Sequence, residues 1–408
     1  MLEKYYERLT EVVEEYGTPV YVYFEDILRE KCRTFVNTFK KYFRRGLVAY
    51  AYKANSNPYL LKIIHEEGLG AEVVSGGELY IALKIGANPR KIVFDGVSKS
   101  LWELEQAVKN DIFLINIESL GEAEKLINLI RQKGKSARLG VRLNVDILAG
   151  AHAYIKTGGR IHKFGVDFKT LPKIAQIAGK YLAGLHAHIG SQIFDVTPYL
   201  LLIKRLWEAF SILLKEGVLV EVFDIGGGFG VNYQDSTTVS LEEFFNKISE
   251  HLYSKASKVG VEPYVIVEPG RYIVAQAGVL LTRVNYVKEV YGRKWILIDA
   301  GMNDFIRPAF YKAKHRITLL GKNYEELIEY NVGGPVCESS DIFGEKIKLP
   351  QVNPGDVIVI HGVGAYGYSM SSNYNMRPRP PEVLISSHGD IKLIRKRETL
   401  EDLLNQVP

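Results

Sequence analysis

One repeating pattern dominates the first two thirds of the chain: a short run of apolar, β-prone residues, a polar or glycine-containing corner, and then a helix-like segment. Eight such runs occur, and they are residues 47–52, 71–74, 92–94, 112–116, 138–144, 183–189, 220–225 and 264–268. Segments between them, such as LWELEQAVKN, place apolar residues at helical spacing. Near-continuous apolar strands that alternate with helices indicate parallel pairing, because crossover helices cover both sheet faces. Eight units over roughly 250 residues predict a TIM-like (β/α)8 barrel, with a doubly wound sheet as the structural alternative.

The sequence changes character after Tyr272. Runs such as KWILIDA and DVIVIHG are separated by turn residues, with few helical patterns between them. The stretch PEVLISSHGDIKLIRKRE is typical of a hairpin with its turn near Gly389. We therefore expect an α/β chain with a barrel over residues 26–272. Residues 273–408 should form a mostly antiparallel β domain, joined by residues 1–25 with the early strand PVYVYF.

Composition excludes several classes of protein. The chain has 408 residues, and its 52 Lys and Arg against 47 Asp and Glu are interspersed, so no basic run predicts a nucleic-acid groove. No uninterrupted apolar stretch is long enough to span a membrane, and the charged N-terminus lacks the apolar core of a secretory signal. Two cysteines are too few for a disulfide framework. We expect a soluble, cytoplasmic enzyme of anionic ligands, without nucleic-acid or membrane partners.

The first barrel strand runs directly into Lys53, in YAYKANSNP. A barrel enzyme builds its site from strand ends, because parallel strands bring their carboxyl ends to one rim. Desolvation behind a buried strand favours the uncharged amine, which is the form that attacks a carbonyl to make a Schiff base. An exposed lysine at a strand terminus is the alternative.

The sixth and seventh strands end in HAHIGSQI and DIGGGFG. His188 is expected to face the pocket mouth, and Ser191 can donate a hydrogen bond to a phosphate. Gly226, Gly227 and Gly228 permit close backbone approach to an anion, and consecutive N–H groups can form an anion-binding nest. The run matches neither a Walker A loop nor GxGxxG, so a nucleotide site has little support. A structural histidine and a tight turn without ligand remain the alternatives.

The eighth strand ends in EPGR. Glu268 can pair with a heterocyclic nitrogen, Gly270 allows close packing, and Arg271 offers a planar fork for a carboxylate or phosphate. A surface salt bridge is the alternative for this motif. Together these motifs place a lysine nucleophile, a phosphate-binding turn and an acid at the ends of different strands. This combination indicates a site for a phosphorylated cofactor, and no metal is expected.

The predicted β domain carries further candidates. DAGMNDFIRPAFY places Arg307 and Tyr311 in a polar-aromatic stretch suited to a substrate carboxylate. GGPVCESSD sets Cys337 and Glu338 on a turn, with a buried, inert cysteine as the alternative. Tyr366 lies in the glycine- and tyrosine-rich stretch GAYGYSMSSNYNMRPRPPE. These residues can serve a barrel site only if this β domain, or that of another subunit, covers the barrel mouth.

In an ordered set of motifs the chain resembles the diaminopimelate decarboxylases, which make L-lysine from meso-2,6-diaminopimelate. The motifs are YAYKAN, AEVVSGGEL, HAHIGSQI, DIGGGFG, EPGR, DAGMNDFIRPAFY, GGPVCESSD and GAYGYSMSSNYNMRPRPPEVL. A single motif such as GGGFG is unspecific, but the ordered set spans nearly the whole chain and is highly specific. The KFG corner at residues 163–165 belongs to the match, whereas the preceding TGGRIH departs from it.

The resemblance implies an alanine-racemase-like architecture, a pyridoxal 5′-phosphate cofactor and a homodimer with shared active sites. It implies that Lys53 forms the internal aldimine, that His188 stacks on the pyridine ring and that Glu268 pairs with the ring nitrogen. The implied phosphate ligands are Ser191, Gly226, Gly227, Gly228, Gly270, Arg271 and Tyr366. The implied substrate ligands are Arg271, Arg307, Tyr311 and Tyr366, with Glu338 of the partner reading the distal amine. Carbon dioxide would leave an external aldimine, and Cys337 of the partner or Lys53 would reprotonate the quinonoid that remains.

Three other readings compete with this one. Related enzymes of ornithine, arginine or carboxynorspermidine bind a cationic substrate end, which an acidic residue should meet in place of Arg307. Alanine racemases use an arginine at the ring nitrogen, where this chain has Glu268. A non-catalytic homologue would usually lose the lysine or the cysteine, and both Lys53 and Cys337 are present.

Overall fold

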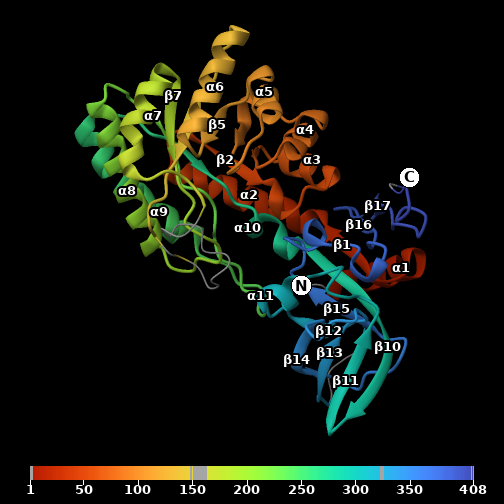
Figure 1. The fold of residues 1–408 in the computed structure, drawn as a ribbon. Coiled ribbons are helices and arrows are strands. Elements are labelled where there is room, and N and C mark those ends of the chain that lie inside the picture. Colours follow the sequence, from red (N-terminus) through yellow and green to blue (C-terminus); the bar gives the residue numbers. More distant parts are fainter. Residues whose placement is uncertain (1–2, 148, 150–162, 322–325, 406, 408) are drawn as a thin grey trace. The chain divides into compact units, whose positions relative to one another are not determined.

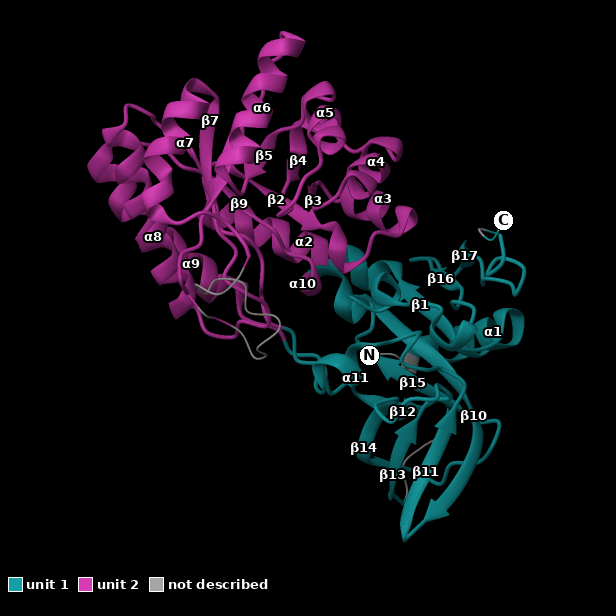
Figure 2. Ribbon diagram, viewed as in Figure 1, with its two compact units in different colours: residues 1–30, 231–237, 273–408 teal, residues 31–230, 238–272 magenta. Residues whose placement is uncertain are grey.

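The structure is a computed structural model that describes residues 3–147, 149, 163–321, 326–405 and 407. The chain divides into two compact units (Figure 2). The barrel unit comprises residues 31–230 and 238–272, and the β unit comprises residues 1–30, 231–237 and 273–408. Residues 26–30 and 231–237, which the sequence placed with the barrel, therefore group with the β unit. The TGGRIH stretch, residues 157–162, lies outside the described residues.

Eight parallel strands close the barrel unit into a ring (Figure 1). They are β2 Gly46–Ala51, β3 Gly70–Val73, β4 Ile92–Phe94, β5 Leu114–Ile117, β6 Leu139–Arg142, β7 Leu182–His186, β8 Val222–Asp224 and β9 Tyr264–Val267. Each predicted run overlaps one of these strands, and β9 pairs with β2 to close the circle. The predicted (β/α)8 barrel is confirmed.

Helices connect the strands, and their starts follow from capping side chains. The helices are α2 Glu25–Tyr42, α3 Pro58–Glu66, α4 Gly76–Lys84, α5 Leu101–Lys109, α6 Leu120–Lys133, α7 Leu171–Ala178, α8 Thr197–Lys215, α9 Leu241–Val259 and α10 Arg271–Val274. Ser75, Ser100, Ser119 and Ser240 each accept a hydrogen bond from the backbone N–H three residues later, at the starts of α4, α5, α6 and α9.

Apolar side chains fill the body of the barrel. One buried cluster joins residues from β2, β4, β5, β8 and β9, together with Phe113 just before β5. The interior is therefore a packed core with no pore, as in other barrels of eight strands. Polar side chains are concentrated at the carboxyl rim, where they are available for chemistry.

The β unit contains one sheet of nine strands. They are β1 Val20–Phe24, β10 Gly278–Val290, β11 Arg293–Ile298, β12 Ile317–Leu319, β13 Ile328–Gly333, β14 Ile342–Leu349, β15 Val357–His361, β16 Glu382–Ile385 and β17 Ile391–Arg395. Most pairs are antiparallel, but β1 runs parallel to β16 and β11 parallel to β13. The early strand therefore joins this sheet as predicted, and β16 and β17 form the predicted hairpin. Two helices, α1 Tyr6–Tyr16 and α11 Arg307–Tyr311, complete the unit.

We searched the described residues for a helix with the length and apolar character needed to cross a membrane, and none met both conditions.

Candidate active site

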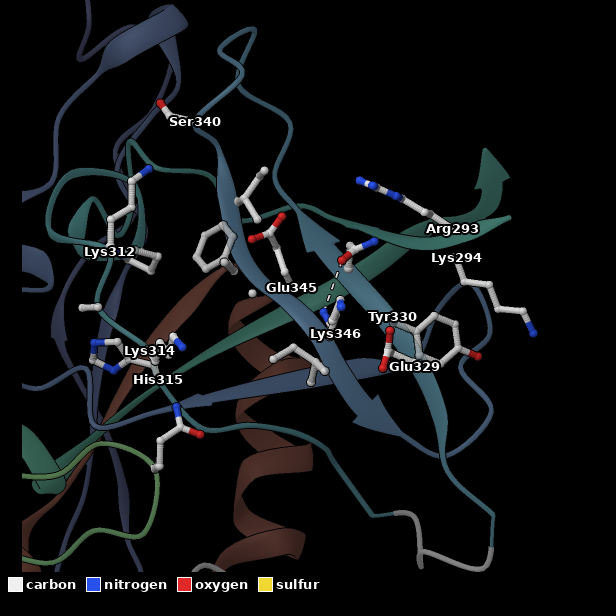
Figure 3. Close-up of a pocket in the computed structure, with 18 of the residues that line it drawn as sticks. Arg293, Lys294, Lys312, Lys314, His315, Glu329, Tyr330, Ser340, Glu345 and Lys346 are labelled. Carbon is white, nitrogen blue, oxygen red and sulfur yellow. Dashed lines mark hydrogen bonds between the residues drawn. The ribbon is translucent and has the colours of Figure 1, made fainter. Parts of the chain in front are cut away.

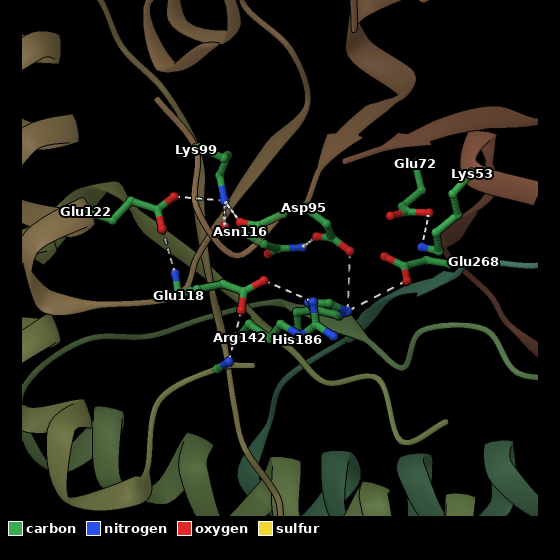
Figure 4. A network of polar contacts seen from close by, with 12 residues as sticks. Lys53, Glu72, Asp95, Lys99, Asn116, Glu118, Glu122, Arg142, His186 and Glu268 are labelled. Carbon is green, nitrogen blue, oxygen red and sulfur yellow. Dashed lines mark hydrogen bonds and ion pairs between the residues drawn. The ribbon is translucent and has the colours of Figure 1, made fainter. Parts of the chain in front are cut away.

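A ring of buried polar side chains lies at the carboxyl rim of the barrel (Figure 4). Each member is the last or next-to-last residue of its strand or directly follows it. The members are Glu72 on β3, Asp95 after β4, Asn116 on β5, Arg142 on β6, His186 on β7, Asp224 on β8 and Glu268 after β9. Burying so many polar groups is costly unless they pair, and such clusters mark functional sites.

Lys53 lies in a single 3-10 turn, residues Tyr52–Ala54, directly after β2. Its Nζ is 2.6 Å from Oε2 of Glu72, whose side chain is fully buried while that of Lys53 is about one third exposed. Burial raises the pKa of Glu72, and the charge of Lys53 opposes that rise only in part. The pair can therefore pass a proton from the amine to the carboxylate, which leaves Lys53 in its nucleophilic form.

The glycine turn after β8 is held against the start of the EPGR turn. The Gly226 N–H donates to Asp224 Oδ1 at 3.0 Å, and the Glu268 N–H donates to the Gly226 carbonyl at 2.9 Å. A Cβ atom at Gly227 would lie 2.1 Å from the Glu268 carbonyl oxygen, so no larger residue fits there. The turn therefore needs glycine because it packs directly against the neighbouring strand ends.

His188 is held beside the same turn. Its Nδ1 accepts a hydrogen bond from the Gly227 N–H at 3.2 Å. Burial, together with the charge of Lys53, lowers the pKa of His188 well below its usual range. A neutral imidazole that accepts at Nδ1 is what this hydrogen bond requires.

A cationic corner completes the rim. The guanidinium of Arg271, the first residue of α10, is buried and donates from Nη2 to Ser191 Oγ at 3.1 Å. A Cβ at Gly270 would lie 3.0 to 3.1 Å from the side chains of Ala54 and Ala51, so the turn packs tightly on the end of β2. The barrel residues singled out from the sequence thus gather at one rim.

In the β unit, Arg307 is buried among tyrosine rings. Its guanidinium carbon lies 5.3 Å from the ring centre of Tyr233, 5.5 Å from that of Tyr311 and 5.8 Å from that of Tyr366. The structure therefore brings Arg307, Tyr311 and Tyr366 together, as a set of aromatic faces around one cation. Tyr233 was not expected here, because it precedes this part of the chain by about seventy residues and no motif marks it.

Cys337 and Glu338 are placed differently. Both side chains are exposed, on the turn between β13 and β14. The Cys337 backbone N–H donates to Asn375 Oδ1 at 2.8 Å, which ties the turn to the Tyr-rich stretch. The alternative of a buried cysteine is wrong, and both side chains are exposed to solvent.

A hollow of the β unit lies elsewhere (Figure 3). It has a volume of about 1110 Å³ and is lined by residues of β11, β13, β14 and the end of α11. Its cations, Arg293, Lys294, Lys312, Lys314 and Lys346, outnumber the acids Glu329 and Glu345. The predicted site residues are all described in the structure, and none of them lines this hollow.

Comparison with known proteins agrees with the geometry of the rim. Residues 26–275 match the family described as pyridoxal-dependent decarboxylase, pyridoxal binding domain. A diaminopimelate decarboxylase of Helicobacter pylori is 40% identical over 398 residues, covering 96% of each chain, and one of Aquifex aeolicus is 38% identical over 96% of this chain and 92% of its own. The chain belongs to the diaminopimelate decarboxylase family of pyridoxal-dependent enzymes.

Solved members of the family share the whole architecture. The Helicobacter pylori enzyme in complex with L-lysine superposes with a TM-score of 0.89 at 39% identity, covering 97% of this chain and 98% of its own. The enzyme of Methanocaldococcus jannaschii, also with L-lysine, gives 0.91 at 37% identity, covering 98% and 94%. Both comparisons extend over the barrel and the β unit.

The rim residues fit the family's cofactor, pyridoxal phosphate. Lys53 offers an amine at the rim, and Arg271 and Ser191 offer hydrogen-bond donors for a phosphate. Glu268 Oε1 is buried and has no hydrogen-bond partner among the described residues, so it is available to a ring nitrogen. Sequence reasoning missed the other members of the polar ring. The signal was present, since Glu72 interrupts the apolar run AEVV.

Proposed function

We propose that this chain decarboxylates meso-2,6-diaminopimelate to L-lysine and carbon dioxide at the barrel rim, as the last step of lysine synthesis. The observation that carries the proposal is the convergence of Lys53, the Gly226–Gly228 turn and Glu268 on one rim. The proposal is supported by the names of relatives that align over nearly the full length of the chain.

Pyridoxal phosphate, when bound, supplies an aldehyde that reacts with amines and a ring that accepts the electron pair left by departing carbon dioxide. Lys53 would hold it covalently through Nζ, and His188 would cover one ring face. Glu268 Oε1 would accept a hydrogen bond from the protonated ring nitrogen and so keep the proton there, and a protonated ring is the stronger electron acceptor. The phosphate ligands in this proposal are Ser191, Gly226, Gly227, Gly228, Gly270, Arg271 and Tyr366.

Arg307 would bind a substrate carboxylate. The cation is buried, so a substrate carboxylate would meet it in a medium of low dielectric, where pairing is strong. Tyr311 and Tyr366 lie against the same guanidinium and can donate hydrogen bonds from their hydroxyls. Arg271 would contribute to the second carboxylate site.

A homodimer is part of the proposal. Cys337 and Glu338 are exposed on one turn, and we assign them to the barrel rim of a partner subunit. There Glu338 would bind the distal amine and Cys337 would deliver a proton to the reacting carbon. Lys53 Nζ, paired with Glu72, is the other proton donor for that carbon. The low cysteine content suits the proposed cytoplasmic location.

The experiment is a decarboxylation assay of the purified protein with added pyridoxal phosphate. Carbon dioxide release and L-lysine formation from meso-2,6-diaminopimelate should exceed the turnover of L-ornithine and L-arginine by at least about 100-fold, because those substrates lack the second, distal carboxylate that Arg307 would bind. Comparable turnover of L-ornithine would contradict the substrate assignment.

A further inference from the structure

Behind Glu268 the polar ring contains an imidazole held between two carboxylates. Nε2 of His186 lies 3.7 Å from Glu268 Oε2 and 3.6 Å from Asp95 Oδ2. At most 3% of any of the three side chains is exposed. Both ring nitrogens of His186 are buried, and neither has a hydrogen-bond partner in the described part of the chain. Figure 4 shows the imidazole pointing toward both acids.

Glu268 needs a compensating charge. Burial, and then the negative charges of Asp95 and Glu72, raise the pKa of Glu268 well above its usual range, against which Lys53 acts only in part. Asp224, also buried, has its pKa raised by burial and then by the charge of Glu268 itself. Without a nearby positive charge, Glu268 would keep its own proton and could not accept a hydrogen bond from a protonated ring nitrogen.

Asp95 behaves in the opposite way. Burial alone would raise its pKa, but the positive charges of His186, Arg142 and Lys53 outweigh burial and hold it low. Asp95 therefore stays charged and lies 3.6 Å from His186 Nε2. On its other side, the same nitrogen faces Glu268, the acid proposed to meet the ring nitrogen of the cofactor.

Asp95 is fixed by a network that is independent of any ligand. Its Oδ1 accepts a hydrogen bond from Asn116 Nδ2 at 2.7 Å, and the Asn116 carbonyl accepts one from Lys99 at 2.7 Å. Lys99 is buried and pairs with Glu122 at 2.8 Å. A Cβ at Gly140 would lie 1.8 Å from Asn116 Oδ1, so a glycine on β6 is needed to leave room for this amide.

We propose that His186, anchored by Asp95, is a positioning residue that keeps Glu268 in place as a carboxylate toward the ring nitrogen of the cofactor. His186 acts through Glu268 and touches neither substrate nor cofactor. The inference rests on the proposed function and adds to it the group that controls how well the ring accepts electrons.

The test compares the holoenzyme with the variants His186→Leu, His186→Gln and Asp95→Asn. In His186→Leu, kcat for meso-2,6-diaminopimelate should fall by about 10- to 100-fold, the loss typical of removing a partner that orients a reactive group. KM should stay within about 3-fold, because substrate contacts are unchanged. His186→Gln keeps a hydrogen-bond donor in place of the imidazole and should fall between the wild type and His186→Leu. Asp95→Asn should resemble His186→Gln.

Two readouts do not depend on turnover. The absorbance band of the bound cofactor should shift in His186→Leu at fixed pH, because the protonation of the ring nitrogen changes. Titration of the apo-protein with pyridoxal phosphate should give a dissociation constant about 10-fold weaker. The matched control is Leu206→Ala, which removes a fully buried side chain of α8. It should lower the melting temperature while leaving kcat, the band and cofactor affinity at wild-type values.

The proposal is overturned if His186→Leu and Asp95→Asn match Leu206→Ala in kcat and absorbance. It is also overturned if the wild-type holoenzyme contains one divalent metal per chain that His186→Leu loses, because Asp95, His186 and Glu268 would then be ligands. A wild-type protein that binds no pyridoxal phosphate and releases no carbon dioxide would instead reject the proposed function. The two failures are therefore distinguishable.

Discussion

The two units carry their candidate residues in different ways. In the barrel unit they converge on one rim, because eight parallel strands must end at the same side of a closed ring. In the β unit they divide between the buried cluster around Arg307 and the exposed turn of Cys337 and Glu338. A mostly antiparallel sheet has no common strand end, so its functional groups depend on loops. A site inside the barrel can be assembled within one unit, whereas an exposed turn needs another surface.

Removing the amine of the barrel rim tests most strongly whether the barrel unit holds the reaction centre. Lys53→Ala should abolish the absorbance band of covalently held cofactor and lower kcat by at least about 1,000-fold, because the nucleophile is lost. Absorbance spectra and a carbon dioxide assay measure the effect. The exposed Lys62→Ala on α3 serves as the control and should match the wild type. Wild-type turnover in Lys53→Ala would remove the barrel rim as the reaction centre.

The buried cluster of the β unit gives the next largest effect. Arg307→Ala should lower kcat/KM roughly 100- to 1,000-fold, since a desolvated charge loses its partner. The cofactor band should persist, because Arg307 is not among the proposed cofactor ligands. Arg293→Ala, in the basic hollow of Figure 3, should leave kcat/KM unchanged. Equal losses in the two variants would mean that the hollow, too, serves the reaction.

The exposed turn is tested by Cys337→Ala. We expect kcat to fall about 100-fold, the contribution of one positioned proton donor. The melting temperature should change by less than about 1 °C, because an exposed side chain contributes little to stability.

Mixing the two inactive variants tests whether Cys337 serves a partner. If each site combines Lys53 of one chain with Cys337 of the other, random mixing of Lys53→Ala and Cys337→Ala should restore about a quarter of wild-type activity. Activity that stays at the level of the separate variants would place both residues in sites of a single chain.

The smallest predicted effect is a pH dependence of the free energy of unfolding, caused by a buried carboxyl group near the rim. Burial, and then the charge of Glu72, raise the pKa of Glu78 from 4.5 to about 7. The folded state thus binds this proton more tightly than the unfolded state does. This tighter binding stabilises the folded state in full below pH 4.5, and the stabilisation is lost as the pH rises to about 7. The loss amounts to about 3 kcal/mol. Glu78→Gln should remove this slope in denaturant unfolding of the apo-protein between pH 5 and pH 8. The exposed Glu124→Gln on α6 should keep it.

Much of the barrel could be predicted from the sequence, and less of its site. The eight strands were readable because each is a short apolar run between a helix and a corner. Lys53, the glycine turn and Glu268 were readable because they stand directly after such runs. Glu72 and His186 were missed because they lie within strands, where a polar residue usually marks a solvent-facing side. Only a closed barrel turns those positions toward a shared interior.

The β unit was predicted as a fold, and its cluster of candidate residues was predicted in part. Alternating strands and turn residues indicated an antiparallel sheet, and β16 and β17 follow that pattern. One neighbour of Arg307 could not be predicted, because Tyr233 comes from a loop that interrupts the barrel segment of the chain. Sequence distance and spatial distance are unrelated for such a loop, and a single sequence holds no signal of that contact.

The hydrogen bond from Glu268 to Gly226 has a consequence for which cofactors this rim can accept. The glycine backbone at one end and the carboxylate at the other belong to two segments in direct main-chain contact, so neither can shift without the other. The span between the glycine turn and the Glu268 Cα is therefore set by the backbone, and the Glu268 side chain alone can adjust the distance to its carboxylate. If these two groups hold the cofactor as proposed, a heterocycle that differs in length by more than that side chain can span would lose one of the two contacts.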